Sequence, residues 1–181
     1  INLNNNNITT LPMWKRAKAG LGYLPQQPSI FRGLSVENNI MAILETTKLN
    51  LDQRINRLEE LLAEFNLTHL RNAMPHQLSG GERRKCECAR LLGTNPSYVL
   101  FDEPFSALDP ISINDIKSEI NRLKKKGISV IITDHQVREV LDISDYSYLL
   151  FSGEIIAHGT SDKILGNKEA RKFYLGDTFK F

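Results

Sequence analysis

Two short apolar segments on either side of a helical pattern constrain the fold of this chain most. Residues 98–101 (YVLF) and 129–133 (SVIIT) are rich in β-branched and aromatic residues, which is typical of strands buried in a parallel sheet. The sequence between them predicts a helix over about residues 112–126, ended by Gly127. A strand, a helix and a strand in this order form a right-handed crossover, so the chain is expected to be an α/β protein with a mostly parallel sheet. The inward positions of the helix are predicted to be Ile113, Ile116, Ile120 and Leu123.

Further elements are expected on both sides of this unit. The segment LGYLPQ at residues 21–26 reads as a strand that leads into a loop at Pro25, and the four asparagines before it as a turn. The pattern predicts helices over residues 36–44, 52–65 and 80–92, and a hairpin turning at Ser152 and Gly153. The second of these helices carries an apolar stripe, which we expect in the core: Ile55, Leu58, Leu61, Leu62 and Phe65.

Composition excludes several classes of protein. The 181 residues are 41% hydrophobic and carry a net charge of +2, which fits one globular domain and favours neither nucleic acid nor an acidic membrane surface as a partner. No apolar run reaches the roughly 18 residues that cross a bilayer, and no signal peptide is visible, so we expect a cytosolic protein with at most a peripheral membrane role. Cys86 and Cys88 lie two positions apart in a predicted helix and are expected to pack rather than to bind metal.

Polar residues follow the ends of the predicted parallel strands. Gln26, the pair Asp102 and Glu103, and His135 all occupy such ends, where ligands bind in open α/β sheets. An aspartate there suits Mg²⁺ held through its water shell, and a neighbouring glutamate suits activation of an attacking water. A histidine could donate a hydrogen bond to a terminal phosphate. The alternatives are an acidic loop start and a structural histidine, the role also expected for His69, His76 and His158.

The segment SGGE at residues 79–82 has the pattern of a helix N-terminus. Ser79 and Glu82 fit a capping box, and Gly80 and Gly81 leave backbone N–H groups uncovered, so an anion could dock there. The next three residues are basic, which opposes the helix dipole. A solvated basic face is the simpler interpretation of this run, which comprises Arg83, Arg84 and Lys85.

Five short motifs follow one another along the chain. They are GYLPQ ending at Gln26, LSGGE at residues 78–82, YVLFDEP around Glu103, SALD ending at Asp109, and His135. In this order they resemble the Q-loop, signature motif, Walker B strand, D-loop and switch histidine of the ATP-binding cassette (ABC) ATPases. The resemblance covers nearly the whole chain and implies a single ABC ATPase domain of the P-loop NTPase fold. Its RecA-like core would comprise residues 1–29 and 93–181, and its helical subdomain residues 30–92.

The resemblance also implies cofactors, site residues and partners. ATP and Mg²⁺ would be the cofactors, with Glu103, His135 and Gln26 catalytic and Asp102 and Gln26 at the metal. Because each signature segment in the family closes over ATP held by another subunit, we expect a homodimer. The nucleotide would be contacted by Ser79, Gly80, Gly81, Glu82 and Asp109.

One family motif is absent from the sequence. The chain contains no G-x-x-x-x-G-K-[ST] phosphate-binding loop, which in the family precedes the Q-loop. The start at Ile1 fits a domain that is incomplete at its N-terminus, and we expect at least about 30 further residues, the size of a strand–loop–helix unit.

Finer features point to a branch of the family. The segment at residues 24–44, ITDHQVREVL and the tail FYLGDTFKF resemble ATPases that power lipopolysaccharide export, while branched-chain amino-acid importer ATPases share a similar tail. The resemblance implies that Phe31 and Arg32 help form a groove for transmembrane permease subunits, at the cytoplasmic face of the inner membrane. A truncated, non-hydrolysing cassette is a further alternative. A soluble ABC ATPase acting on DNA or ribosomes is disfavoured, because residues 27–77 leave room for only a small helical subdomain.

Overall fold

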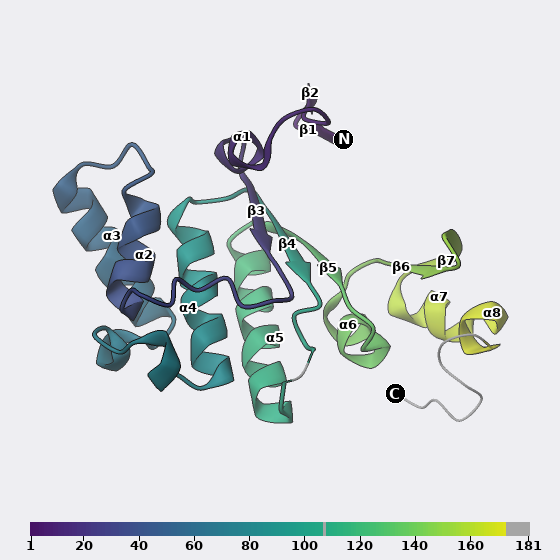
Figure 1. Ribbon diagram of the computed structural model, residues 1–181. Coiled ribbons are helices and arrows are strands. Elements are labelled where there is room, and N and C mark those ends of the chain that lie inside the picture. Colours follow the sequence, from purple (N-terminus) through teal and green to yellow (C-terminus); the bar gives the residue numbers. More distant parts are fainter. Residues whose placement is uncertain (107, 173–181) are drawn as a thin grey trace. The chain divides into compact units, whose positions relative to one another are not determined.

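The computed structural model describes residues 1–106 and 108–172 (Figure 1). The chain divides into two compact units, Ile1–Thr133 and Asp134–Phe181, and each is described by itself. The predicted boundaries of a helical subdomain at residues 30–92 stay a prediction.

A three-stranded parallel sheet lies at the centre of the first unit. Its order is β3 (Leu21–Leu24), β4 (Tyr98–Asp102) and β5 (Ser129–Thr133). The parallel pairing confirms the predicted α/β class. The central strand β4 buries Val99 and Phe101 on one face of the sheet, while Leu100 on the other face is only partly buried.

The predicted burial of the third strand is wrong. The side chains of β5 alternate between partly and largely exposed, and Ile131 is 57% exposed. Within the described residues β5 pairs with β4 alone, so β5 is an edge strand of the sheet. An edge strand has a neighbouring strand on one side only.

The crossover between β4 and β5 is helix α5 (Pro110–Lys125). Asp109 caps its start, and Gly127 adopts a left-handed φ of 77° just after its end, as the sequence indicated. Three of the four predicted inward residues are buried, namely Ile116, Ile120 and Leu123, while Ile113 is partly covered.

Helices α2 (Val36–Leu44), α3 (Leu51–Glu64) and α4 (Gly80–Gly93) pack against one another, and α4 also contacts β3 (Figure 1). Each helix begins at a side-chain cap, with full capping boxes at α3 and α4. Two 3₁₀ turns, η1 (Thr68–Leu70) and η2 (Pro75–Gln77), join α3 to α4. The predicted stripe on α3 is buried except at Ile55, which is 43% exposed, so that part of the prediction is wrong.

The chain starts with a short hairpin. Strands β1 (Asn2–Leu3) and β2 (Asn6–Asn7) pair antiparallel, and Asn4 and Asn5 turn between them with positive φ angles. Asparagine tolerates this left-handed conformation, so the predicted asparagine turn is confirmed. Helix α1 (Met13–Lys18) then leads into β3.

The second unit contains α6 (Val137–Ile143), the strands β6 (Ser147–Phe151) and β7 (Glu154–Gly159), and the short helices α7 (Ser161–Gly166) and α8 (Lys168–Ala170). The two strands form the predicted hairpin, turning at Ser152 and Gly153. Its small core comprises Leu141, Leu149, Ala157, Ile164 and Ala170. The tail at residues 173–181 lies outside the described residues. Among the helices described, none has the length and apolar character to span a membrane.

Candidate functional site

The carboxyl ends of β3 and β4 bring two of the predicted residues together. Gln26 follows β3, and its Nε2 donates a hydrogen bond of 2.8 Å to Oε2 of Glu103, which follows β4. The two residues are 77 positions apart in sequence. Parallel pairing of the strands explains the contact, because their carboxyl ends meet at one edge of the sheet. The expected convergence of Gln26 with the acidic pair is therefore confirmed.

The side chain of Asp102 is oriented by hydroxyl groups from both neighbouring strands. Tyr23 Oη on β3 donates to Asp102 Oδ2 at 3.0 Å, and Thr133 Oγ1 on β5 donates to Asp102 Oδ1 at 2.8 Å. The hydrogen bond to Asp102 is the largest cause that raises the pKa of Tyr23 above its ordinary value. Sequence reasoning missed both hydroxyls, which lie near the ends of the flanking strands.

Glu103 has an unusual backbone conformation. Its φ of 44° lies in the left-handed region, which costs a residue with a side chain about 1–3 kcal/mol. The Glu103 N–H donates to the carbonyl of Thr133 at 2.7 Å, and the buried Pro104 and Phe105 follow. This conformation turns the chain at the end of β4 and places the Glu103 carboxylate within reach of Gln26.

The predicted capping box at the start of α4 is confirmed. Ser79 N donates to Glu82 Oε2 at 2.7 Å, and Glu82 N donates to Ser79 Oγ at 3.2 Å. The hydrogen bond from the Ser79 backbone holds the pKa of Glu82 below its ordinary value. A side-chain atom added at Gly80 would meet open space, so the backbone there is accessible to an anion.

Asp109 is connected to the start of α4 through Ser112. Asp109 accepts hydrogen bonds from the backbone of Ile111 and Ser112 and from Ser112 Oγ at 2.5 Å. The hydroxyl of Ser112 is the largest cause that lowers the pKa of Asp109. The same hydroxyl lies 3.2 Å from the position of a Cβ at Gly81. Asp109 thus acts as the cap of α5 in this structure, and its contact with nucleotide stays a prediction.

The basic run after the signature segment is not a solvated face. Arg84 is buried and pairs with Glu87, and Lys85 Nζ lies 2.6 Å from Asp115 Oδ2 on α5. The simpler interpretation is therefore wrong for Arg84, whose Nη1 contacts Glu87 and the carbonyl of Pro25, while its buried Nε and Nη2 have no hydrogen-bond partner among the described residues. Cys86 and Cys88 are buried on the same helix, and burial raises the pKa of each thiol to about 12, which confirms their packing role.

The remaining predicted residues lie outside this cluster. Phe31 and Arg32 are exposed in the loop between β3 and α2, as residues that meet a partner must be. His135 belongs to the second unit, where its Nδ1 lies 3.6 Å from Asp134 Oδ1 and its side chain is 64% exposed. Its predicted place beside Glu103 stays a prediction.

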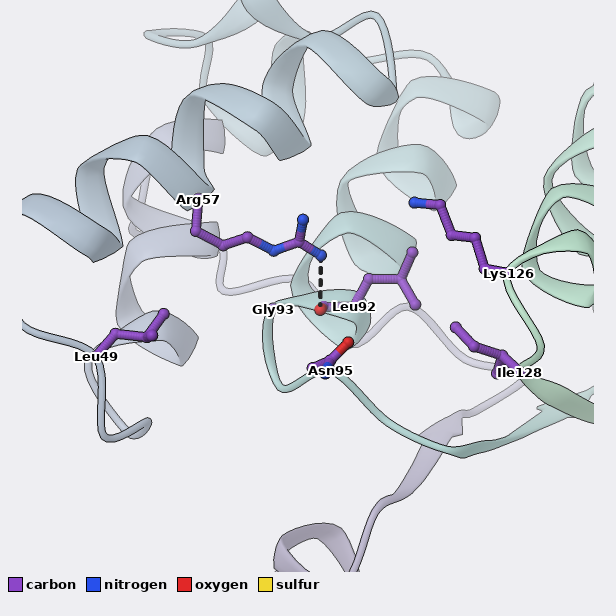
Figure 2. A pocket seen from close by; sticks show the side chains of 7 residues that line it. All are labelled: Leu49, Arg57, Leu92, Gly93, Asn95, Lys126 and Ile128. Carbon is purple, nitrogen blue, oxygen red and sulfur yellow. Dashed lines mark hydrogen bonds between the residues drawn. The ribbon is translucent and has the colours of Figure 1, made fainter.

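A pocket of about 420 Å³ opens at the other end of α4 (Figure 2). Arg57 points into it and donates from Nη2 to the carbonyl of Leu92 at 3.4 Å. None of the predicted site residues lines this pocket, which is bounded by Leu49, Arg57, Leu92, Gly93, Asn95, Lys126 and Ile128. The signature segment and this pocket therefore lie at opposite ends of one helix.

A parallel sheet with an amide–carboxylate contact at its carboxyl edge, and a glycine-rich helix start, define the class of the protein. Residues 1–106 match the family described as "ABC transporter". The chain belongs to this family, among its ATP-binding cassettes.

Two relatives and one solved structure show which members of the family the chain resembles. It is 50% identical over 179 residues to an uncharacterized ABC transporter ATP-binding protein, R00382, of Rhizobium meliloti, covering 99% of this chain and 66% of that one. It is 48% identical over 174 residues to the lipopolysaccharide export system ATP-binding protein LptB of Haemophilus influenzae, covering 96% and 72%. The chain thus spans about two thirds of the length of the first relative. Among solved structures, the ADP conformation of MJ1267, an ATP-binding cassette of an ABC transporter, matches with a TM-score of 0.80 and 26% identity, covering 97% of this chain and 76% of that one.

Proposed function

We propose that the complete protein hydrolyses ATP to drive an ABC transporter. The hydrogen bond between Gln26 and Glu103 carries this proposal, because it joins the end of one strand to a carboxylate at the end of the next. Glu103 would accept a proton from the attacking water, and Gln26 would hold that water in line. His135 would hydrogen-bond the terminal phosphate. The strained backbone of Glu103 supports a functional role, since such conformations cluster at active sites.

The donor set fits ATP and Mg²⁺. Mg²⁺ keeps several waters and needs one or two protein oxygens, which Asp102 and the Oε1 of Gln26 supply. When bound, Mg²⁺ would neutralise charge developing on the phosphates. The chain contains no glycine–lysine phosphate loop and spans about two thirds of the first relative, so the proposal assigns the grip on the phosphates to the complete protein.

Assembly with other subunits completes the proposal. The segment at residues 79–82 and Asp109 would close over nucleotide held by a second copy in a homodimer, using the N–H groups at the start of α4. Phe31 and Arg32 are exposed and would meet a coupling helix of transmembrane permease subunits. The protein would then lie peripherally on the cytoplasmic face of the inner membrane, with no nucleic acid as a partner.

The cargo is proposed to be lipopolysaccharide, because relatives 47–48% identical to the chain are lipopolysaccharide export ATP-binding proteins. A branched-chain amino-acid importer is the second candidate, and a non-hydrolysing fragment the third. Reconstitution of the complete protein with its membrane subunits in liposomes distinguishes these three candidates. We expect ATP-dependent release of lipopolysaccharide to an acceptor. ATP-driven uptake of leucine without such release would contradict the proposed cargo.

ATP binding by the 181-residue chain tests the hypothesis that the chain is a non-hydrolysing fragment. Without a phosphate-binding loop of its own, it should bind ATP only weakly, with no saturation at micromolar concentrations in calorimetry. Micromolar affinity for ATP would show that the chain holds nucleotide unaided.

A further inference from the structure

Helix α4 carries three charged side chains that all contact one loop. They occur at every third position, Arg84, Glu87 and Arg90, and so lie along one side of the helix. The loop spans residues 25–31, begins one residue before the Gln26 that contacts Glu103, and runs past α4 toward α2 (Figure 1). These contacts link the catalytic edge of the sheet to the helix that begins with the signature segment.

Glu87 makes the central contact. Its Oε1 accepts hydrogen bonds from the backbone N–H of Ser29 at 2.5 Å and of Ile30 at 3.1 Å, and its side chain is only 3% exposed. A carboxylate that is removed from water and accepts two backbone N–H bonds is a strong anchor, because the Ile30 donor would otherwise be buried without this partner. These two hydrogen bonds attach the loop to α4 at the third and fourth residues after Gln26.

The two arginines complete the attachment on either side. Arg84 Nη1 donates to the carbonyl of Pro25 at 2.9 Å and lies 3.3 Å from Glu87 Oε2. Arg90 Nη1 donates to the carbonyl of Ser29 at 2.6 Å, and its guanidinium lies 4.1 Å from the centre of the Phe31 ring. Arg84 supplies the charge that compensates Glu87 in this buried position.

We propose that Glu87, supported by Arg84 and Arg90, is a positioning residue. By holding the backbone at Ser29 and Ile30 against helix α4, it sets the position of Gln26 relative to Glu103. The inference rests on the proposed ATPase function, but the attachment itself is independent of nucleotide.

Hydrogen exchange of the complete, nucleotide-free protein tests the attachment. Glu87→Ala removes the acceptor, and the Ser29 and Ile30 amides should exchange at least about tenfold faster. Glu87→Gln keeps an acceptor oxygen and should restore most of the protection. Amides of Val99 and Phe101 in β4 report whether the variants are folded, and Glu60→Ala, an exposed glutamate on α3, is the matched control. Unchanged exchange at Ser29 and Ile30 in a folded Glu87→Ala protein would overturn the proposal.

ATPase kinetics test the positioning role. Glu87→Ala should lower kcat by about 10- to 100-fold while KM for ATP stays within about twofold, because Gln26 is displaced and the nucleotide contacts are not. Glu87→Gln should recover most of kcat. Equal loss in the Ala and Gln variants, or a loss confined to KM, would contradict positioning through the loop. Absence of turnover in the unsubstituted protein would instead contradict the proposed function and leave the exchange result standing.

Discussion

The carboxylate of Asp102 lies between two hydroxyl groups, and this arrangement has a measurable consequence. Tyr23→Phe removes the donor to Oδ2 and leaves that oxygen less well oriented toward a cation. One such hydrogen bond is worth about 1 kcal/mol, so the Mg²⁺ concentration for half-maximal ATPase activity should rise about fivefold. Tyr98→Phe is the matched control, since Tyr98 Oη donates to Asn4 Oδ1 near the start of the chain. An equal Mg²⁺ requirement in the two variants would show that Tyr23 does not orient Asp102.

At the scale of single residues, the sequence predicted part of the candidate functional site. Gln26 and Glu103 could be expected to meet, because parallel strands end at the same edge of a sheet. Tyr23 and Thr133 could not, because hydroxyl contacts depend on the register between strands, which the sequence does not specify. The burial of Arg84 was also missed, because its partner Pro25 lies 59 positions away in the loop after β3.

Helix α4 depends on its capping box, and the dependence should vary with pH. The pKa of Glu82 is lowered in the folded protein, chiefly by the hydrogen bond from Ser79 N–H. A lowered pKa means that the stabilisation is present at pH values above the ordinary glutamate pKa and is lost as the pH falls through the folded value. Glu82→Ala should therefore lower the free energy of unfolding by about 1 kcal/mol at pH 7 and by less at pH 3.5.

Urea unfolding at the two pH values measures this difference. Glu45→Ala, an exposed glutamate just after α2, is the matched control and should change little. A loss of stability in Glu82→Ala that is equal at both pH values would mean that the charged carboxylate does not make the cap.

Helices and strands were predicted closely because their periodicity and caps are local properties. Helix α2 and strand β5 have the predicted bounds, and α4 ends one residue later than expected. Burial was predicted less well. Ile55 continues the apolar stripe of α3 but is left exposed, and β5 has an apolar composition but pairs on one side alone among the described residues. The exposure of Ile55 and that of β5 depend on which neighbouring elements pack against them, and not on the sequence of α3 or β5 alone.

The whole chain exposes apolar surface along its three-stranded sheet, and we expect this to govern its behaviour in isolation. Ile131 on β5 is largely exposed, and among the described residues one edge of β5 has no partner strand, a combination that favours association between chains. Ile131→Lys should slow aggregation of the 181-residue chain, measured by light scattering. Ile111→Lys places the same charge on an exposed position of helix α5 and is the control. Equal slowing by both variants would indicate a general charge effect and not association through the sheet.

ATP hydrolysis by the complete protein is the central claim, and Glu103→Gln tests it most directly. The substituted amide keeps the size of the side chain but cannot accept a proton from water. ATP affinity should stay within about threefold, and turnover should fall by about 10²- to 10⁴-fold. Glu154→Gln, at an exposed position at the start of β7, should hydrolyse ATP at the unsubstituted rate. Near-normal turnover in Glu103→Gln would contradict the assignment of Glu103 as the base.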